Sequence, residues 1–328
     1  MSDNNGSNAP SLAHRLADLP EDFSDFVDIY ERELHPQLAE KEAERKHAWE
    51  AAKQRAIVGA VIAVVAAIAG LVILHMPWLA IIGVFVGVGV GASGFPAVNA
   101  VSKQAKVMMI TPIAAKFGLT YNEQVSQTAE ANLLKCNQMK VVPGWDRKIL
   151  SDEFIGERNG TAFSFFEAHL EEKRTRRTSN GRTSTYWVTT FRGQCWVMDA
   201  PKTFHGTTRV ARDSGLLNAL GAIGNQFSRA KLEDPEFEKS FEVYTTDQVE
   251  SRFLLTPDVM VTFMDIEKRY KNAKFRATFH DDKIFVALEN GDLFEGGGMM
   301  TAIDDPEQVG DLLEDFAVVF HLVDALNK

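Results

Sequence analysis

The sequence predicts a membrane-anchored α+β protein. It should have an N-terminal helix, a two-helix transmembrane hairpin, and then a mixed domain with a mainly antiparallel sheet and flanking helices. Three observations lead to this fold class. No charged residue lies between Arg55 and Lys103. That interval holds two apolar runs long enough to cross a bilayer. Residues 104–328 then show strand-like alternation and helix-like periodicity in turn.

Residues 1–55 are expected to form a disordered tail (1–17) followed by amphipathic and charged cytoplasmic helices (18–55). The tail begins MSDNNGSNAPS and is poor in apolar residues. After Asp18-Leu19-Pro20, which is typical of a helix cap and start, apolar residues follow helical spacing at Phe23, Phe26, Val27, Tyr30 and Leu34. Pro36 should interrupt this helix. We expect the apolar stripe to pack on the protein's own domain, with a partner-binding helix as the alternative.

Residues 56–98 are predicted to form the transmembrane hairpin. Its two runs are AIVGAVIAVVAAIAGLVIL (56–74) and WLAIIGVFVGVGVGASGFPAV (78–98). As helices they would be roughly 29 and 31 Å long, against a hydrocarbon core of about 30 Å. Each run can therefore span a bilayer once, and the short connector between them makes the second helix antiparallel to the first. A wedge within one leaflet is the alternative, and the length of the runs argues against it.

The stretch GVGVGASG (87–94) has the GxGxxG spacing of some nucleotide-binding loops. Such a loop also needs an acidic residue about 20 positions on, but nothing acidic follows before Glu123. We interpret the glycines as packing positions, because small residues four apart let two helices approach closely in lipid. The predicted packing residues are Gly59, Ala63 and Ala67 in the first run and Gly83, Gly87 and Gly91 in the second. The same faces are compatible with a homo-oligomer.

Charge and cysteine content predict the compartment. Lys and Arg flank the hairpin but are absent from its connector, so the positive-inside rule places both termini and the main domain in the cytoplasm. Cys136 and Cys195 lie on dissimilar segments, which predicts reduced thiols rather than a disulfide framework. The net charge is −10. This acidic balance gives no reason to expect nucleic acid as a partner.

Residues 104–328 are predicted to form the cytoplasmic α+β domain. A long antiparallel hairpin is expected from residues 161–172 and 183–201, which are separated by a turn containing Asn180 and Gly181. Further strands are expected at 207–212, 241–246, 274–279 and 283–289. Helices should begin at a capping box formed by Asp247 and Glu250, at Thr256-Pro257, and at Asp305-Pro306.

Three segments of this domain carry a family pattern: residues 191–213, 231–260 and 283–297. The second is the most specific, with DPxFE at 234–238, Val243-Tyr244, Asp247-Gln248 and LTP at 255–257. In this order they resemble the bacterial domain-of-unknown-function 3137 family, over roughly residues 20–300. The resemblance implies a bacterial integral membrane protein, here of the inner membrane, with a cytoplasmic α+β domain. It implies no activity, cofactor or catalytic residue.

The sequence contains no motif that predicts catalysis. Its eight histidines are scattered, without HExxH or paired-cysteine spacing, so no metal site is expected. No nucleophile elbow or phosphate-binding P-loop occurs, and no cofactor is predicted. Cys195 and His205 could form a nucleophile and base across a turn, but a buried strand cysteine is the favoured interpretation.

One positive signal is the run KRTRRTSNGR at residues 173–182. It brings five cations to the tip of the predicted hairpin: Lys173, Arg174, Arg176, Arg177 and Arg182. A solvated loop is the simplest interpretation. The sharper hypothesis is contact with anionic lipid head groups, nucleic acid or an acidic protein partner.

These features favour an integral membrane scaffold or regulatory binding module over a catalyst. The alternative is an enzyme acting on a membrane-associated or lipid-like substrate. A concave pocket with converging polar groups would favour that alternative.

Overall fold

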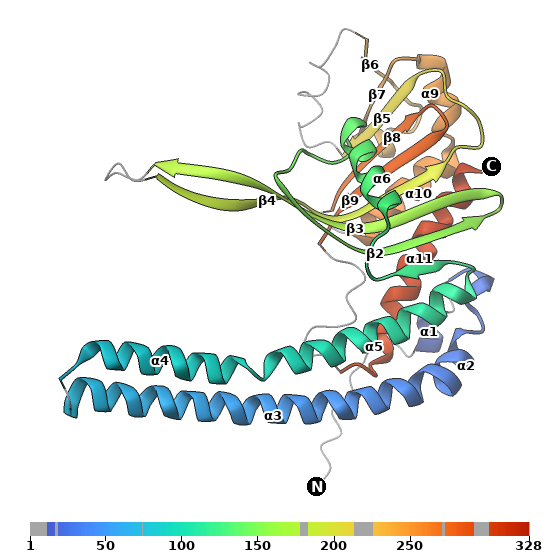
Figure 1. Cartoon of the computed structure of the whole chain (residues 1–328). Coiled ribbons are helices and arrows are strands. Elements are labelled where there is room, and N and C mark those ends of the chain that lie inside the picture. The colour runs from blue at the N-terminus through green and yellow to red at the C-terminus, as the bar shows by residue number, and fades with distance from the viewer. Residues whose placement is uncertain are drawn as a thin grey trace. The chain divides into compact units, whose positions relative to one another are not determined.

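The computed structural model describes residues 12–16, 19–73, 75–177, 183–212, 226–270, 273–291 and 302–327. The chain divides into two compact units, and the division falls within helix α5 and within helix α11 (Figure 1). Residues up to Ile110, together with Glu295–Leu313, form the first unit. Thr111–Phe294 and Glu314–Lys328 form the second.

The first unit is helical. Its elements are α1 (Leu12–Leu16), η1 (Glu21–Phe23), α2 (Phe26–Ile29), η2 (Tyr30–Leu34), α3 (His35–Ile68), η3 (Ala69–Ile73), α4 (Pro77–Ala92) and most of α5 (Phe95–Lys116). The unit also includes the start of α11 (Pro306–Leu326). Leu12 and Leu16 are buried, so residues 12–16 are helical although the sequence suggested a disordered tail there. The rest of that predicted tail, residues 1–11 and 17, lies outside the described residues.

An ion pair on α3 binds the backbone that precedes α11. The buried Glu42 carboxylate accepts hydrogen bonds from Arg45 Nε at 2.7 Å and Arg45 Nη2 at 2.8 Å. It also accepts the backbone N–H of Ile303 at 3.0 Å. The Arg45 hydrogen bond lowers the pKa of Glu42 to about 2, against the opposing effect of burial. The contact joins segments 261 positions apart in the chain.

Helices α3 and α4 run antiparallel, side by side (Figure 1). The helical segments Glu21–Leu71 and Pro77–Lys116 are both candidate membrane spans, with a mean hydropathy of 2.0 in their most apolar windows. Only 11% and 17% of those windows is buried. Large apolar side chains such as Ile57, Ile81 and Phe85 are exposed instead, which is unlike the core helix of a soluble protein.

The second unit contains a nine-stranded antiparallel sheet. Its strands are β1 (Thr120–Asn122), β2 (Arg147–Arg158), β3 (Thr161–Arg177), β4 (Thr183–Asp199), β5 (Thr207–Arg212), β6 (Ser228–Arg229), β7 (Phe241–Thr245), β8 (Lys274–His280) and β9 (Lys283–Glu289). They pair in the order β1-β2-β3-β4-β9-β8-β5-β7-β6. The predicted α+β class with a mainly antiparallel sheet is confirmed.

Helices cover both faces of this sheet. On one face, α6 (Gln127–Gln138) packs Ala129, Leu133 and Cys136 against a core that includes Phe166 and Cys195. The other face meets α10 (Pro257–Arg269) and α11. On that face Phe316 packs edge-on against Phe154 at 5.1 Å between ring centroids, and Phe263 packs against Phe275 at 4.7 Å. The unit also contains two shorter helices, α8 (Pro235–Ser240) and α9 (Gln248–Leu254).

A bulge in β2 positions α6. The register shifts between Ser151 and Phe154, and Glu153 at this bulge is fully buried. Its carboxylate accepts hydrogen bonds from the Ser126 backbone N–H at 2.7 Å and the Ser126 hydroxyl at 2.8 Å. Ser126 is in turn the N-cap of α6. The bulge therefore places a charged hydrogen-bond acceptor at the start of a helix, which is a favourable position for it.

The local structure departs from expectation at three points. Pro36 is the second residue of α3 and does not end a helix; its missing N–H falls in the first turn of α3, directly after the π-helical turn η2. The run expected to be helical over 78–98 breaks at Ser93-Gly94, where a side chain at Gly94 would come within 2.5 Å of Ala52 Cα. Asp247 caps α9 as predicted. Glu250, however, accepts the backbone N–H groups of residues 205 and 206 in place of the reciprocal capping-box bond.

Candidate interaction surface

The basic run predicted at a hairpin tip lies on a two-stranded arm. Strand β2 pairs with β3 only as far as Glu171, and β9 pairs with β4 only from Gln194 onward. Beyond those points β3 and β4 pair with each other alone, from Glu172 opposite Val188 to Arg177 opposite Thr183. We call residues 172–177 and 183–188 the arm. Its six cross-strand pairs extend past the rest of the sheet (Figure 1). At the rise of a β-strand this is about 20 Å.

Both faces of the arm carry cations and an aromatic residue. Residues directly opposite in an antiparallel pair share a face, so one face holds Lys173 opposite Trp187, followed by Arg177. The other holds Arg174 opposite Tyr186, followed by Arg176. All of these residues are exposed, with Tyr186 at 45% and Trp187 at 41% of their full accessible surface.

Among the described residues, most of the arm's cations have no carboxylate partner. Arg174 pairs with the exposed Glu172 at 3.2 Å. Within the described part of the chain, no carboxylate pairs with Lys173, Arg176 or Arg177. The fifth predicted cation, Arg182, lies outside the described residues. A solvated cation without a partner keeps its charge available to an incoming anion, so the arm can act as a concentrated positive site on an acidic chain.

The root of the arm is fixed to the sheet by side chains from β2 and the loop before it. The guanidinium of Arg147 lies 4.4 Å from the centre of the Trp187 ring and also pairs with Glu171. The carboxylate of Asp146 accepts the backbone N–H of Lys173 at 2.8 Å. Cation–π contacts of this kind contribute about 0.5–1 kcal/mol at exposed sites. The arm is therefore held at its base while its cations remain in solvent.

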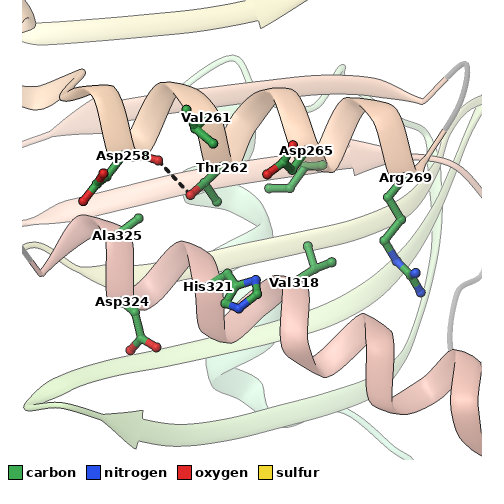
Figure 2. A pocket seen from close by; sticks show the side chains of 10 residues that line it. Asp258, Val261, Thr262, Asp265, Arg269, Val318, His321, Asp324 and Ala325 are labelled. Atoms are coloured by element: carbon green, nitrogen blue, oxygen red, sulfur yellow. Dashed lines mark hydrogen bonds between the residues drawn. The ribbon is translucent and has the colours of Figure 1, made fainter. Parts of the chain in front are cut away.

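A groove of about 620 Å³ lies between α10 and α11 (Figure 2). It is lined by Asp258, Val261, Thr262, Asp265, Ile266, Arg269, Val318, His321, Asp324 and Ala325. Two of its charged side chains, Asp324 and Arg269, are already held in ion pairs with other parts of the protein. Asp324 accepts two hydrogen bonds from Arg158, each at 2.8 Å, and Arg269 binds Glu314 and Asp315. Among the described residues no cluster of His, Cys, Asp or Glu could hold a metal ion.

The two cysteines come together on the α6 side of the sheet. Cys136 and Cys195 are both free thiols and fully buried in one core cluster. Burial raises the pKa of the Cys195 thiol well above its ordinary value, and a hydrogen bond with Cys136 adds to the rise. His205 is exposed in the loop before β5, while Cys195 is enclosed among apolar side chains. The structure therefore gives Cys195 the properties of a core thiol and brings no histidine to it as a base.

Glycines line the interface between α3 and α4. A Cβ atom added at Gly87 would lie 2.4 Å from the carbonyl oxygen of Gly59 and 2.8 Å from Ala63 Cβ. One added at Gly59 would lie 2.7 Å from the backbone nitrogen of Gly91. Opposite Gly83 the nearest residue is Ala66, the neighbour of the proposed Ala67. Backbones this close leave no room for larger side chains.

Residues 189–328 match the family described as protein of unknown function (DUF3137). This region belongs to the DUF3137 family. All three segments that carry the resemblance begin and end inside it, so the predicted family is confirmed over this region. The DUF3137 region starts in β4, just beyond the arm, and includes β5–β9 and α8–α11. The match does not extend to the apolar hairpin.

The crystal structure of the mycobacterial trehalose monomycolate transport factor A, TtfA, is similar at 10% sequence identity. The likeness covers 66% of this chain and 95% of that chain, with a TM-score of 0.34. At this level it supports no conclusion about the function of the present chain. No curated protein matches.

Sequence reasoning located the cations of the surface but missed Tyr186, Trp187 and the supporting Arg147. Their role depends on where β2 and β9 stop pairing with the hairpin. The alternation in TSTYWV indicated a strand, but it did not indicate that both of its faces would be in solvent.

Proposed function

We propose that the chain is an integral protein of the bacterial inner membrane that acts as a scaffold or regulatory binding module. In this proposal residues 56–98 cross the bilayer twice and residues 18–55 form cytoplasmic helices. Both termini and the α+β domain (104–328) lie in the cytoplasm, and the arm is the surface that captures an anionic partner. The observation that carries the binding role is the two-stranded arm, with exposed cations on both faces.

The membrane part of the proposal rests on the helix pair. The apolar windows of the helical segments Glu21–Leu71 and Pro77–Lys116 are long enough to span and bury little of their surface within the protein. Burial of such side chains in lipid removes an apolar area that water would otherwise solvate, which favours insertion. The close glycine contacts explain how two such helices stay paired where no hydrophobic effect drives them together.

The alternative of an enzyme with a lipid-like substrate gains no support from the α10–α11 groove. Converging polar groups in an active site need to be available to a substrate. Here Asp324 and Arg269 are held in ion pairs with neighbouring helices and strands. The arm, by contrast, presents its charges to solvent. We therefore favour binding over catalysis.

The test is brief cross-linking of the full-length protein in its own membranes, followed by gentle purification and mass spectrometry. The variant replaces Arg174, Arg176, Arg177 and Arg182 with Ser. A matched control removes four exposed cations elsewhere in the domain, by replacing Lys231, Lys239, Arg252 and Lys268 with Ser. A partner or lipid retained by the control and lost from the arm variant supports the proposal. Equal recovery from both variants contradicts it.

A further inference from the structure

We propose that the partner of the arm is the head-group surface of an anionic phospholipid leaflet. This inference rests on the proposed function, because it assumes that the chain is held at a membrane. It deepens that function by naming the ligand: a fluid layer of phosphate-bearing lipids, in preference to a shaped acidic protein or a nucleic acid.

The arm distributes its charge over both of its faces. Four of the five consecutive positions 173–177 of β3 are cations, and both faces carry two of them: Lys173 and Arg177 on one, Arg174 and Arg176 on the other. None is buried. A shaped protein partner would favour a single charged face with fixed geometry. Lipid head groups can move laterally and gather around charges on both sides of a ribbon, so they can satisfy both faces at once.

A pair of aromatic residues lies near the base of the arm. Each face carries one large aromatic residue next to its cations, Trp187 beside Lys173 and Tyr186 beside Arg174. Trp and Tyr are the residues enriched where a membrane meets water, because each has an apolar ring and a polar group that stays hydrated. The arm thus combines cations for phosphate with rings suited to the head-group layer.

The arm is held in shape before it binds. Arg147 stacks on Trp187, and Asp146 holds the backbone of Lys173. A ribbon fixed at its root loses little conformational freedom on docking. Tethering by the transmembrane helices then makes docking intramolecular, so that a weak contact per lipid suffices.

The experiment places the full-length protein in nanodiscs of phosphatidylcholine alone or of phosphatidylcholine mixed with phosphatidylglycerol. An environment-sensitive fluorophore is attached to Thr185→Cys at the middle of the arm. The control label is at Asp282→Cys, in the β8–β9 turn at the opposite end of the sheet. The two native thiols are fully buried and leave the attached label as the reporter.

We expect the arm label, and not the control label, to report an apolar environment in phosphatidylglycerol discs at low salt. The response should fade at about 1 M salt, where the Debye length is about 3 Å. Each cation replaced by Ser should lower the docking constant about fivefold. A variant with Arg174, Arg176 and Arg177 changed to Lys keeps the charge and should keep the response. Trp187→Ser should weaken docking at every salt concentration.

The outcomes separate the two proposals. If the chain does not enter discs at all, the proposed function fails and this inference fails with it. If it enters discs but the arm label responds equally to both lipid compositions, the inference alone is overturned. Loss of the response in the Arg-to-Lys variant also overturns it, because dependence on guanidinium geometry points to a shaped acidic protein.

Discussion

Replacing Gly87 with Ala should weaken the α3–α4 pair, while replacing Gly89 with Ala should not. A Cβ atom at Gly87 would meet the Gly59 carbonyl oxygen at 2.4 Å and Ala63 Cβ at 2.8 Å, whereas nothing lies within 4 Å of one at Gly89. Favoured carbon contacts are about 3.5–4.0 Å, so the helices must separate by about 1 Å at Gly87. Both variants share the same gain in helix propensity, about 1 kcal/mol. The difference in stability between the two variants therefore measures the cost of the steric clash at Gly87.

Forced overpacking costs about 1–3 kcal/mol, and a gap of about 1 Å also removes up to about half of the dispersion energy of the contacts that it opens. We therefore expect Gly87→Ala to be less stable than Gly89→Ala by about 1–3 kcal/mol. The assay is unfolding of the full-length protein in detergent micelles by titration with a denaturing detergent, followed by circular dichroism. Equal midpoints for the two variants would refute close glycine packing between these helices.

Three further predictions concern buried groups. Glu42→Gln should lower the free energy of unfolding by about 3 kcal/mol, because it leaves Arg45 buried without its carboxylate. Because the pKa of Glu42 is lowered, the stability that Glu42 contributes is fully present above its ordinary pKa of 4.5 and is lost as the pH falls toward about 2. The assay is the free energy of unfolding of wild type and Glu42→Gln, measured across this pH range. Cys136 and Cys195 should resist maleimide at neutral pH and react only after denaturation, because both side chains are fully buried and out of reach of the reagent. Gly193→Ala should lower the thermal midpoint, since the added Cβ would lie 2.0 Å from a carbonyl oxygen of β9.

Each of these has a result that would contradict it. A stability difference between wild type and Glu42→Gln that stays constant from pH 5 to about pH 2 would exclude the lowered pKa. Rapid alkylation of the folded protein would show that the α6 core opens easily. Gly144, where a Cβ meets nothing within 4 Å, supplies the control for Gly193. Equal thermal midpoints for the two alanine variants would rule out the tight approach of β4 to β9.

Much of the domain's secondary structure could be predicted because its signals are local. Residues 207–212 and 283–289 form strands with the predicted bounds, since their alternation is uninterrupted. Thr256-Pro257 and Asp305-Pro306 mark the starts of α10 and α11, because cap chemistry acts within one turn. Strand β2 was missed. Its bulge at Asp152 interrupts the period of two on which strand prediction depends.

The candidate surface could be predicted only in part, because its most important properties are long-range. The cations of residues 173–177 are visible in the sequence. The exposure of Trp187 is not, since it depends on β2 ending its pairing at Glu171 and on β9 starting only at Gln194. Likewise, the sequence predicts that Glu250 closes a capping box, but its carboxylate instead accepts a hydrogen bond from the backbone N–H of Gly206, 44 positions away. Such competition between partners is decided by tertiary structure.

The most direct test of the central claim, a membrane-anchored binding module with a cytoplasmic arm, is cysteine labelling in intact cells. His75→Cys lies in the connector between α3 and α4, and Ser184→Cys lies on the arm. Both are probed with a membrane-impermeant maleimide. With the connector in the periplasm and the arm in the cytoplasm, we expect His75→Cys to be labelled in intact cells and Ser184→Cys to be labelled only after the membrane is opened. Protection of His75→Cys in intact cells, or labelling of Ser184→Cys in them, would contradict it.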